Sequence, residues 1–312
     1  MSRAFVFPGQ GSQAVGMGRE LAEAFAEARH VFQEVDDALS QKLSVLMFEG
    51  PEDQLTLTEN AQPALMAVSL AVVRVLEAQG GLDLAKDAAF VAGHSLGEYS
   101  ALAAAGTFSL ADTARLLKLR GQSMQKAVPV GVGAMAALLG AEFEQAKEIA
   151  AEAAEGEVCE AANDNGAGQV VVSGHKGAVE RAVKLAAEKG IKRAVMLPVS
   201  APFHCALMQP AADAMAEALA KVAMNAPKAP LVANVIASKV TDPAEIRDLL
   251  VRQVTGTVRW REGVLYMKDN GVTQLVELGA GKVLSGLAKR IDKELSGTNV
   301  GTPADIEAFL KG

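Results

Sequence analysis

Residues 91–102 form the stretch VAGHSLGEYSAL, in which Ser95 lies between two glycines, Gly93 and Gly97. An apolar run, 88–92, precedes this Gly-x-Ser-x-Gly pattern, and a helix-like run follows it. A strand, a sharp turn and a helix in this order form the context in which the pattern exposes a serine hydroxyl at the edge of a parallel sheet. Glycines suit such a turn because they have no Cβ atom. We predict that Ser95 is a nucleophile; the alternative is an ordinary turn with a helix-capping serine.

Predicted strands and helices alternate on both sides of this stretch, which favours an α/β fold with a mostly parallel sheet and helices on both faces. In the middle of the chain the order becomes strand, helix, strand, strand, helix, strand, which is the ferredoxin-like pattern. We predict a small βαββαβ subdomain at 130–198, inserted into a large subdomain formed by 1–129 and 199–312. The six elements of the insertion are predicted at 134–139, 142–154, 158–162, 170–173, 178–189 and 193–197.

The two ends of the chain belong to the predicted large subdomain. Near the N-terminus, a strand at 4–7 is followed by a Gly-rich turn and a long amphipathic helical stretch that ends at Leu39. Toward the C-terminus, we predict a strand at 231–237, a final helix at 283–295 and a short polar tail from Ser296.

The composition indicates a soluble globular protein. Half of the 312 residues are hydrophobic, which is enough for a sizeable core, and the net charge is −7. An acidic balance gives no overall footprint for nucleic-acid binding. We see no apolar run of a secretory signal, and the uncharged stretch 128–141 is too short to span a bilayer. With only two cysteines, the sequence favours the cytoplasm, and we predict no metal site and no membrane partner.

A second Gly-rich pattern, GQGSQA at 9–14, follows the first predicted strand and matches G-x-G-x-x-[GA]. In a dinucleotide-binding fold, a second strand ends in an acidic residue about 20 residues further on. Residues 19–39 instead have the pattern of a helix throughout, so we reject dinucleotide binding. We expect the turn to bring a main-chain N–H group to an oxyanion, because glycines let the backbone approach a ligand closely.

His204 is the predicted base for Ser95; the alternative is a structural histidine. It lies in the Pro-containing stretch LPVSAPFHCALM at 197–208, where the chain returns from the insertion, and we expect it at a strand end of the same sheet as Ser95. The remaining histidines have other predicted places, His30 on an amphipathic helix, His175 at a helix start, and His94 next to Ser95 but pointing away from it.

No acidic residue is well placed to complete a Ser-His-acid triad. Hydrolases of this architecture place an Asp or Glu between the serine and the histidine in chain order. Here Asp112 is at a predicted helix start, and Asp164 lies in the insertion with most of the glutamates between Ser95 and His204. A carbonyl group in place of the acid is the alternative, and the pattern fits an ordinary esterase poorly.

Arg120 occupies a position where a core residue is expected. It shares a helix face with Leu116, Leu117 and Met124. A buried guanidinium needs a carboxylate or several acceptors, because an unpaired buried charge is very costly. Its partner is either an acid of the protein or a substrate carboxylate bound in a bidentate manner, and the residues alone leave both open.

Together these segments resemble the malonyl-CoA:acyl-carrier-protein transacylase family of fatty acid synthesis. The resemblance covers nearly the whole chain, and its segments occur in the expected order. They are FVFPGQGSQ, TENAQPAL, GHSLGEYSAL, the pair Arg120-Gly121, ANDNGAGQVVVSG, LPVSAPFHCALM and LLVRQV. The resemblance implies a large α/β-hydrolase-like subdomain, a small ferredoxin-like one, and an active site in the cleft between them.

The resemblance also implies roles for individual residues. Ser95 would be the nucleophile and His204 its base, with Gln253 orienting His204 through its main-chain carbonyl. Arg120 would hold the malonyl carboxylate, which decides between the two alternatives above. The other implied site residues are Gln10 and Leu96, whose N–H groups would form the oxyanion hole, and Asn163 and Gln62, which would line the cleft.

The implied reaction is a ping-pong transfer of malonyl from malonyl-CoA to the phosphopantetheine thiol of acyl carrier protein, with no bound cofactor. Phe203, next to His204, is expected to disfavour branched acyl groups. A serine hydrolase and a non-catalytic carrier-protein-binding module are the alternative functions. An acidic carrier protein needs a local basic patch, for which the candidates are Lys189, Lys192, Arg193, Lys282, Lys289 and Arg290.

Overall fold

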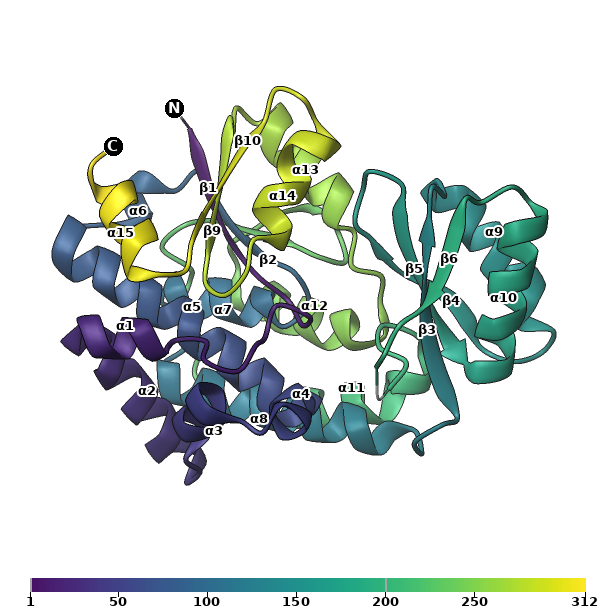
Figure 1. Cartoon of the computed structure of the whole chain (residues 1–312), viewed down its shortest axis with the longest axis horizontal. Helices are drawn as coiled ribbons and strands as arrows, with labels where there is room; N and C mark the ends of the chain where they lie inside the picture. The colour runs from purple at the N-terminus through teal and green to yellow at the C-terminus, as the bar shows by residue number, and fades with distance from the viewer. Residues whose placement is uncertain (1, 200) are drawn as a thin grey trace.

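Two separate β-sheets organise the protein, and the computed structural model describes residues 2–199 and 201–312 (Figure 1). Met1 and Ser200, which the predicted large subdomain includes, lie outside the described residues. The larger sheet has six strands, β1 (Arg3–Phe7), β2 (Phe90–Gly93), β7 (Leu231–Ala233), β8 (Ser238–Val240), β9 (Gln274–Leu278) and β10 (Ser296–Val300). Their order is β10-β9-β1-β2-β7-β8, and only β8 runs antiparallel to its neighbour. The predicted α/β fold with a mostly parallel sheet is confirmed.

Helices cover both faces of this sheet, which is why its central strand β1 is almost wholly apolar. The helices of this part of the chain are α1 (Arg19–Ala24), α2 (Ala26–Leu39), α3 (Leu43–Glu49), α4 (Glu52–Thr56), α5 (Thr58–Gly80), α6 (Leu84–Asp87), α7 (Gly97–Ala104), α8 (Leu110–Ala127), α11 (Gln209–Leu219), α12 (Pro243–Thr255), α13 (Trp260–Asp269), α14 (Val283–Ile291) and α15 (Pro303–Leu310). Along β1, Phe5 and Phe7 pack into the core that contains α5 and α8, whereas Ala4 and Val6 pack against α13 and α14 (Figure 1). This alternation is the two-residue period of a strand.

Helix α5 runs through the middle of the larger core. Its 23 residues are long and apolar enough to pass a length-and-hydropathy test for a membrane span, but 83% of the apolar window is buried inside the protein. Helices α2 and α8 pack along it. Its apolar character is therefore that of a core helix.

The small sheet has four antiparallel strands in the order β4-β5-β3-β6. Its strands and helices are β3 (Gly133–Leu139), α9 (Phe143–Ala154), β4 (Cys159–Asp164), β5 (Gln169–His175), α10 (Lys176–Glu188) and β6 (Arg193–Met196). Both helices lie on one face of the sheet (Figure 1), where Leu138, Ile149 and Val172 share a core. The element order and the strand order are those of the predicted ferredoxin-like arrangement.

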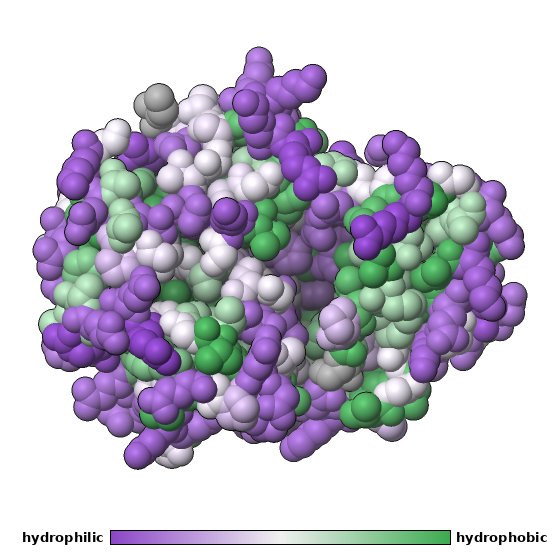
Figure 2. Space-filling view, in the orientation of Figure 1, coloured by the Kyte–Doolittle hydropathy of each residue, from purple (hydrophilic) through white to green (hydrophobic). Residues whose placement is uncertain are grey.

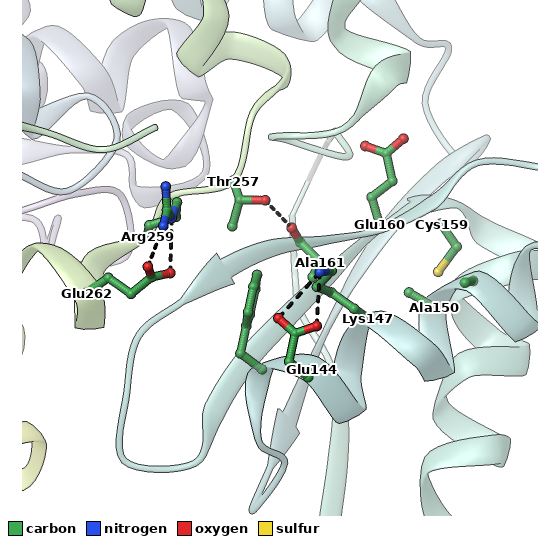
Figure 3. Close-up of a pocket in the computed structure, with 11 residues that line it drawn as sticks. Glu144, Lys147, Ala150, Cys159, Glu160, Ala161, Thr257, Arg259 and Glu262 are labelled. Carbon is green, nitrogen blue, oxygen red and sulfur yellow. Dashed lines mark hydrogen bonds and ion pairs between the residues drawn. The ribbon is translucent and has the colours of Figure 1, made fainter. Parts of the chain in front are cut away.

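The two sheets are joined by hydrogen bonds between β4 and the segment before α13. The N–H of Asp164 donates to the carbonyl of Val258 over 2.9 Å, and the N–H of Val258 donates back to β4. The Thr257 hydroxyl donates to the carbonyl of Ala161 over 2.8 Å (Figure 3). Arg261 forms an ion pair of 2.9 Å with the buried carboxylate of Asp164. These contacts fix the small sheet against the large one.

The C-terminal segment differs from the prediction. Helix α14 ends at Ile291, and the residues expected to form a polar tail form the edge strand β10 and the helix α15. The sequence of β10 is SGTNV, in which only Val300 is buried, so it lacks the apolar run by which a buried strand is recognised. Pairing with β9 places it in the sheet. The predicted strand 231–237 is also shorter, because the chain turns after Ala233 and returns as β8.

Both ends of the chain lie on the side of the molecule away from the small sheet (Figure 1). The Arg3 guanidinium, near the N-terminus, lies over the ring of Phe309 in α15, 5.4 Å from its centre. Helix α15 therefore anchors the C-terminal end beside the first strand.

Candidate active site

Ser95 lies in a tight turn between β2 and α7, as the pattern predicts. Its φ is 54°, in the left-handed region that a residue with a Cβ atom rarely adopts. A Cβ atom at Gly93 would lie 1.9 Å from the backbone of Gly97, and one at Gly97 would lie 2.3 Å from the carbonyl oxygen of Phe7. Both glycines are therefore required by space, and the turn presses against the end of β1.

Ser95 and His204 contact each other directly. The distance from Ser95 Oγ to His204 Nε2 is 2.7 Å, and His204 Nδ1 lies 2.9 Å from the main-chain carbonyl of Gln253. Because a carbonyl only accepts, Nδ1 carries the proton and Nε2 is free to accept one from the serine. Burial, followed by the charge of Arg120, lowers the pKa of His204 to about 3. The neutral imidazole is thus ready to act as a base.

The location of His204 differs from the prediction. It does not follow a strand of the sheet that carries Ser95. The chain leaves the edge strand β6 of the small sheet, and the loop that follows brings His204, with a φ of 58°, across to the serine. A short 3₁₀ turn, Ala206–Met208, then leads into α11. The sequence pattern could not show this crossing, because the loop has no periodicity of its own.

Gln253, on α12, joins the parts of this site. Its side-chain amide donates to the main-chain carbonyl of Ser95 and to the side-chain oxygen of Asn234, both over 3.0 Å. Its side-chain oxygen accepts a hydrogen bond from Arg120 over 2.9 Å, and its own carbonyl holds His204. Gln253 is fully buried, so these bonds do not compete with water. No acid occupies the third position of a triad.

Arg120 is buried beneath the serine, with 1% of its surface exposed. Besides Gln253, its guanidinium donates to the side-chain oxygen of Gln62 over 2.7 Å and to Ser95 Oγ over 3.2 Å. It forms no ion pair with any carboxylate of residues 2–199 and 201–312. The ring of Tyr99 lies 5.7 Å from the guanidinium carbon. Its hydrogen-bond acceptors are neutral groups, the buried Glu98 acts on it only through charge, and the guanidinium lies within reach of the serine oxygen.

Two main-chain N–H groups near Ser95 have no hydrogen-bond partner among the described residues, those of Gln10 and Leu96. The Gly-rich turn brings Gln10 close, since a Cβ atom at Gly9 would lie 2.8 Å from the carbonyl oxygen of His94. The Gln10 side chain is fixed from α5, where the Thr58 hydroxyl donates to it over 2.9 Å. The free donors are available to a ligand oxygen.

A cleft of about 520 Å³ opens above Ser95 and is lined from both sheets. Asn163 of β4 and Phe203 line it together with Ser95, His204 and Gln10. Figure 2 shows the surface hollowed between the two parts of the molecule. Beneath this lining lie Gln62, Arg120 and Gln253, which reach the site through the hydrogen bonds above.

His94 lies at the edge of the same cleft and turns away from Ser95, as predicted. Its Nε2 lies 2.8 Å from Asn165 Oδ1, and its ring lies against Trp260. Because Asn165 follows β4, this hydrogen bond is a further contact between the serine turn and the small sheet. Burial lowers the pKa of His94, which keeps the ring neutral.

A larger pocket of about 620 Å³ lies elsewhere, between α9, β4 and the start of α13 (Figure 3). Four of its charged residues pair with each other, Glu144 with Lys147 and Glu262 with Arg259, and Glu160 accepts the N–H of Ala206. The lining has no histidine and no serine, and burial raises the pKa of its thiol, Cys159, to about 12, which keeps that thiol protonated. The serine–histidine pair, Ser95 and His204, lines the smaller cleft.

Comparison with known proteins agrees with this geometry. The sequence model of the family described as "Acyl transferase domain" matches residues 4–297. This chain belongs to the acyl transferase domain family.

Curated and solved acyl transferases are similar over their full lengths. The malonyl CoA-acyl carrier protein transacylase of Escherichia coli K12 is 48% identical over 308 residues, covering 99% of this chain and 98% of that protein. The solved acyl-carrier-protein S-malonyltransferase of Bartonella henselae is 61% identical, with a TM-score of 0.97 over 100% of this chain and 99% of that one. A malonyl-transacylase solved in complex with a type II polyketide acyl-carrier protein is 44% identical, with a TM-score of 0.96 over 100% and 99% of the two chains.

Two residues of this acyl transferase domain escaped the sequence analysis. Glu98 is fully buried behind the serine turn: one carboxylate oxygen accepts the N–H of Asn234 over 2.8 Å, and the other has no hydrogen-bond partner among the described residues. Burial raises the pKa of Glu98 to about 7. Asn234 follows the buried strand β7 and contacts Ser95 directly. Asn234 could have been found from the sequence LVAN at 231–234, in which a polar residue directly follows an apolar run.

Proposed function

We propose that this protein transfers a malonyl group from malonyl-CoA to the phosphopantetheine thiol of acyl carrier protein through a malonyl-serine intermediate. The observation that carries the proposal is Ser95 Oγ, 2.7 Å from His204 and 3.2 Å from an arginine that forms no ion pair among the described residues. The serine–histidine pair supports acyl transfer, and Arg120 supports an acyl group that ends in a carboxylate. The names of the similar transacylases support both substrates.

In the first half-reaction, Ser95 Oγ attacks the carbonyl carbon of the thioester while His204 Nε2 takes its proton. A C–O bond forms, and the carbonyl oxygen becomes an oxyanion that accepts from the N–H groups of Gln10 and Leu96. Loss of one such donor typically costs ~3–4 kcal/mol in the barrier. The C–S bond then breaks, and the imidazolium returns the proton to the sulfur of coenzyme A.

The second half-reaction runs the same steps in reverse with a different thiol. The malonyl carboxylate stays paired with Arg120, where it replaces the neutral acceptors Gln62 and Gln253. His204 takes the proton of the phosphopantetheine thiol, the sulfur attacks the ester, and Ser95 leaves with the proton. Gln253 keeps the imidazole oriented through its main-chain carbonyl in both halves. The chain's own residues supply all the proton transfers, and the scheme uses no cofactor.

Asn163 and Phe203 are proposed to shape the acyl site, because both line the cleft beside the serine. The ring of Phe203 limits the room at the α-carbon of the acyl group and disfavours a branch there. Competition between malonyl-CoA and methylmalonyl-CoA tests this in wild type and Phe203→Ser. Unchanged selectivity in the variant would overturn the role of Phe203.

The division of the chain into two subdomains is also a proposal. We propose that 130–198 form the inserted subdomain and that 1–129 and 199–312 form the large one, with the phosphopantetheine arm entering the cleft between them. The reaction is proposed to take place in the cytoplasm. The proposed carrier-protein patch combines basic residues from both parts, Lys189, Lys192 and Arg193 on one side and Lys282, Lys289 and Arg290 on the other.

Intact-protein mass spectrometry after mixing with malonyl-CoA tests the central proposal. We expect a long-lived malonyl adduct on wild type that carrier protein discharges, and no adduct on Ser95→Ala. Arg120→Ala should lose most of the adduct, whereas the matched control Arg115→Ala, on an exposed position of the same helix, should not. An adduct equally strong with acetyl-CoA and insensitive to Arg120→Ala, or one released rapidly to water, would favour a serine hydrolase instead.

A further inference from the structure

One more side chain holds the serine turn, that of Asn234. We propose that Asn234 is a positioning residue, which fixes the backbone on the N-terminal side of Ser95 so that the hydroxyl stays aligned with His204. The inference rests on the proposed function, because it concerns the same serine.

Asn234 binds the turn with both ends of its amide. Its Oδ1 accepts the N–H of Ser95 over 3.0 Å, and its Nδ2 donates to the carbonyl of Gly93 over 2.8 Å. The opposite orientation of the amide would face a donor with a donor and an acceptor with an acceptor, so the contacts define which end is which. Asn234 is 97% buried, with 3% of its surface exposed, so water cannot replace it.

The turn needs such support because its conformation is unfavourable. A non-glycine residue with a φ of 54° persists only where its surroundings determine it. Asn234 holds the peptide on the N-terminal side of Ser95, and Gln253 holds the carbonyl on the C-terminal side. Because Asn234 occupies the N–H of Ser95, the next donor along the chain, that of Leu96, is the one left free.

The fold places Asn234 at this point. It is the first residue after β7, which pairs in parallel with β2, so the two strands end side by side at Asn234 and the serine turn. Its own N–H donates to the buried carboxylate of Glu98 over 2.8 Å, and its Oδ1 also accepts from Gln253. Residues of two helices, α7 and α12, thereby hold Asn234 in the position from which it contacts Ser95.

Replacement by alanine tests the role through the rate of the first chemical step. We expect Asn234→Ala to reduce the single-turnover rate of serine acylation by malonyl-CoA about 10²-fold, since a small displacement of a reacting group has effects of this order. The concentration of malonyl-CoA giving half the maximal rate should change less than about threefold, because Arg120 is unaffected. The final yield of malonyl-serine per folded molecule should stay that of wild type.

A core variant serves as the control for lost stability. Leu76→Ala removes a fully buried side chain from the far end of α5 and should lower the melting temperature without changing the acylation rate per folded molecule. If Asn234→Ala likewise lowers only the melting temperature, Asn234 is structural and the inference is wrong. If wild type forms no malonyl adduct at all, the proposed function fails instead.

Asn234→Asp gives a readout that a merely structural role would not change. A protonated aspartic acid has one O–H donor and one carbonyl acceptor, as the amide does, whereas the ionised form cannot donate to Gly93. The titratable and charged groups around it are Glu98, which it contacts directly, and Arg120 and His204, which Gln253 links to it. We expect acylation within about tenfold of wild type near pH 5.5 and a progressive loss relative to wild type as the pH rises. A ratio to wild type that does not vary with pH would overturn the inference.

Discussion

Arg120 and Gln253 are joined by a hydrogen bond of 2.9 Å between a guanidinium nitrogen and the side-chain oxygen, deep beneath Ser95. Because no carboxylate of the described residues bonds this guanidinium, a substrate carboxylate that reaches it gains a strong interaction. The same glutamine also bonds the backbone of Ser95 and the ring of His204. Substrate recognition and the reacting serine are therefore coupled through one residue.

Arg120→Lys should keep the charge and lose the planar fork that binds a carboxylate with two hydrogen bonds. We expect malonyl transfer to fall roughly 10- to 100-fold, the equivalent of about 1.5–3 kcal/mol for hydrogen bonds to a charged group. Acylation by acetyl-CoA, which has no carboxylate, should change less than about threefold. Steady-state kinetics with both thioesters measure the difference. An equal loss with both would show that Arg120 supports the serine turn rather than the substrate.

The pH dependence of Ser95 reactivity should reflect the buried base. Burial and the charge of Arg120 lower the pKa of His204 to about 3, so the imidazole stays neutral and able to accept a proton well below pH 6.5. The rate of Ser95 labelling by a fluorophosphonate should therefore decline only in more acidic solution. Arg120→Gln removes the second cause and should shift the decline to higher pH. A decline near pH 6.5 in both proteins would contradict the assignment.

Gln253→Ala distinguishes the role of the Gln253 side chain from that of its main-chain carbonyl. The main-chain carbonyl that holds His204 remains, while the bonds to Arg120 and Ser95 are lost. We expect kcat to fall about 10-fold, clearly less than the ~10²–10⁴-fold loss expected for His204→Ala, which removes the base. The comparison uses one transfer assay for both variants. Equal losses would mean that the side chain of Gln253, and not its carbonyl, keeps the histidine in place.

Glu98→Gln should stabilise the protein at high pH. Burial raises the pKa of Glu98 to about 7 in the folded protein, so between its ordinary value of 4.5 and about 7 the folded state binds more protons than the unfolded state. The free energy of unfolding therefore falls as the pH rises through this window. We expect the variant to exceed wild type by about 3 kcal/mol at high pH, an order-of-magnitude figure from the shift.

Urea unfolding at pH 5, 6.5 and 8 measures this effect. The advantage of Glu98→Gln should shrink toward pH 5, where wild-type Glu98 is protonated in the folded state. Glu20→Gln, at an exposed position of α1, is the matched control and should show no such trend. A constant difference at every pH would mean that Glu98 does not titrate in this range.

The sequence predicted those features that depend only on residues close to each other in the chain. Gly93 and Gly97 are required by space on either side of the serine, so the pattern identified the turn and the strand and helix that flank it. The alternation of apolar strands and amphipathic helices identified both sheets. Arg120 was recognisable as buried because three apolar residues share its helix face.

Long-range pairing was not predictable in the same way. Strand β10 is polar and belongs to the sheet only because β9 offers a free edge. His204 reaches Ser95 across a non-periodic loop from the other sheet, which no local pattern describes. Asn234 and Glu98 became functional candidates only when the end of β7 was seen beside the end of β2.

The contact between Arg3 and Phe309 places the N-terminal and C-terminal segments of the chain next to each other. In Figure 1 both ends emerge on the side away from the small sheet. A foreign domain fused to either end would therefore leave the cleft uncovered, and a short linker between the two ends would allow circular permutation. The same geometry suits this chain to use as a module within a longer polypeptide, because neighbouring domains on both sides would attach at one place.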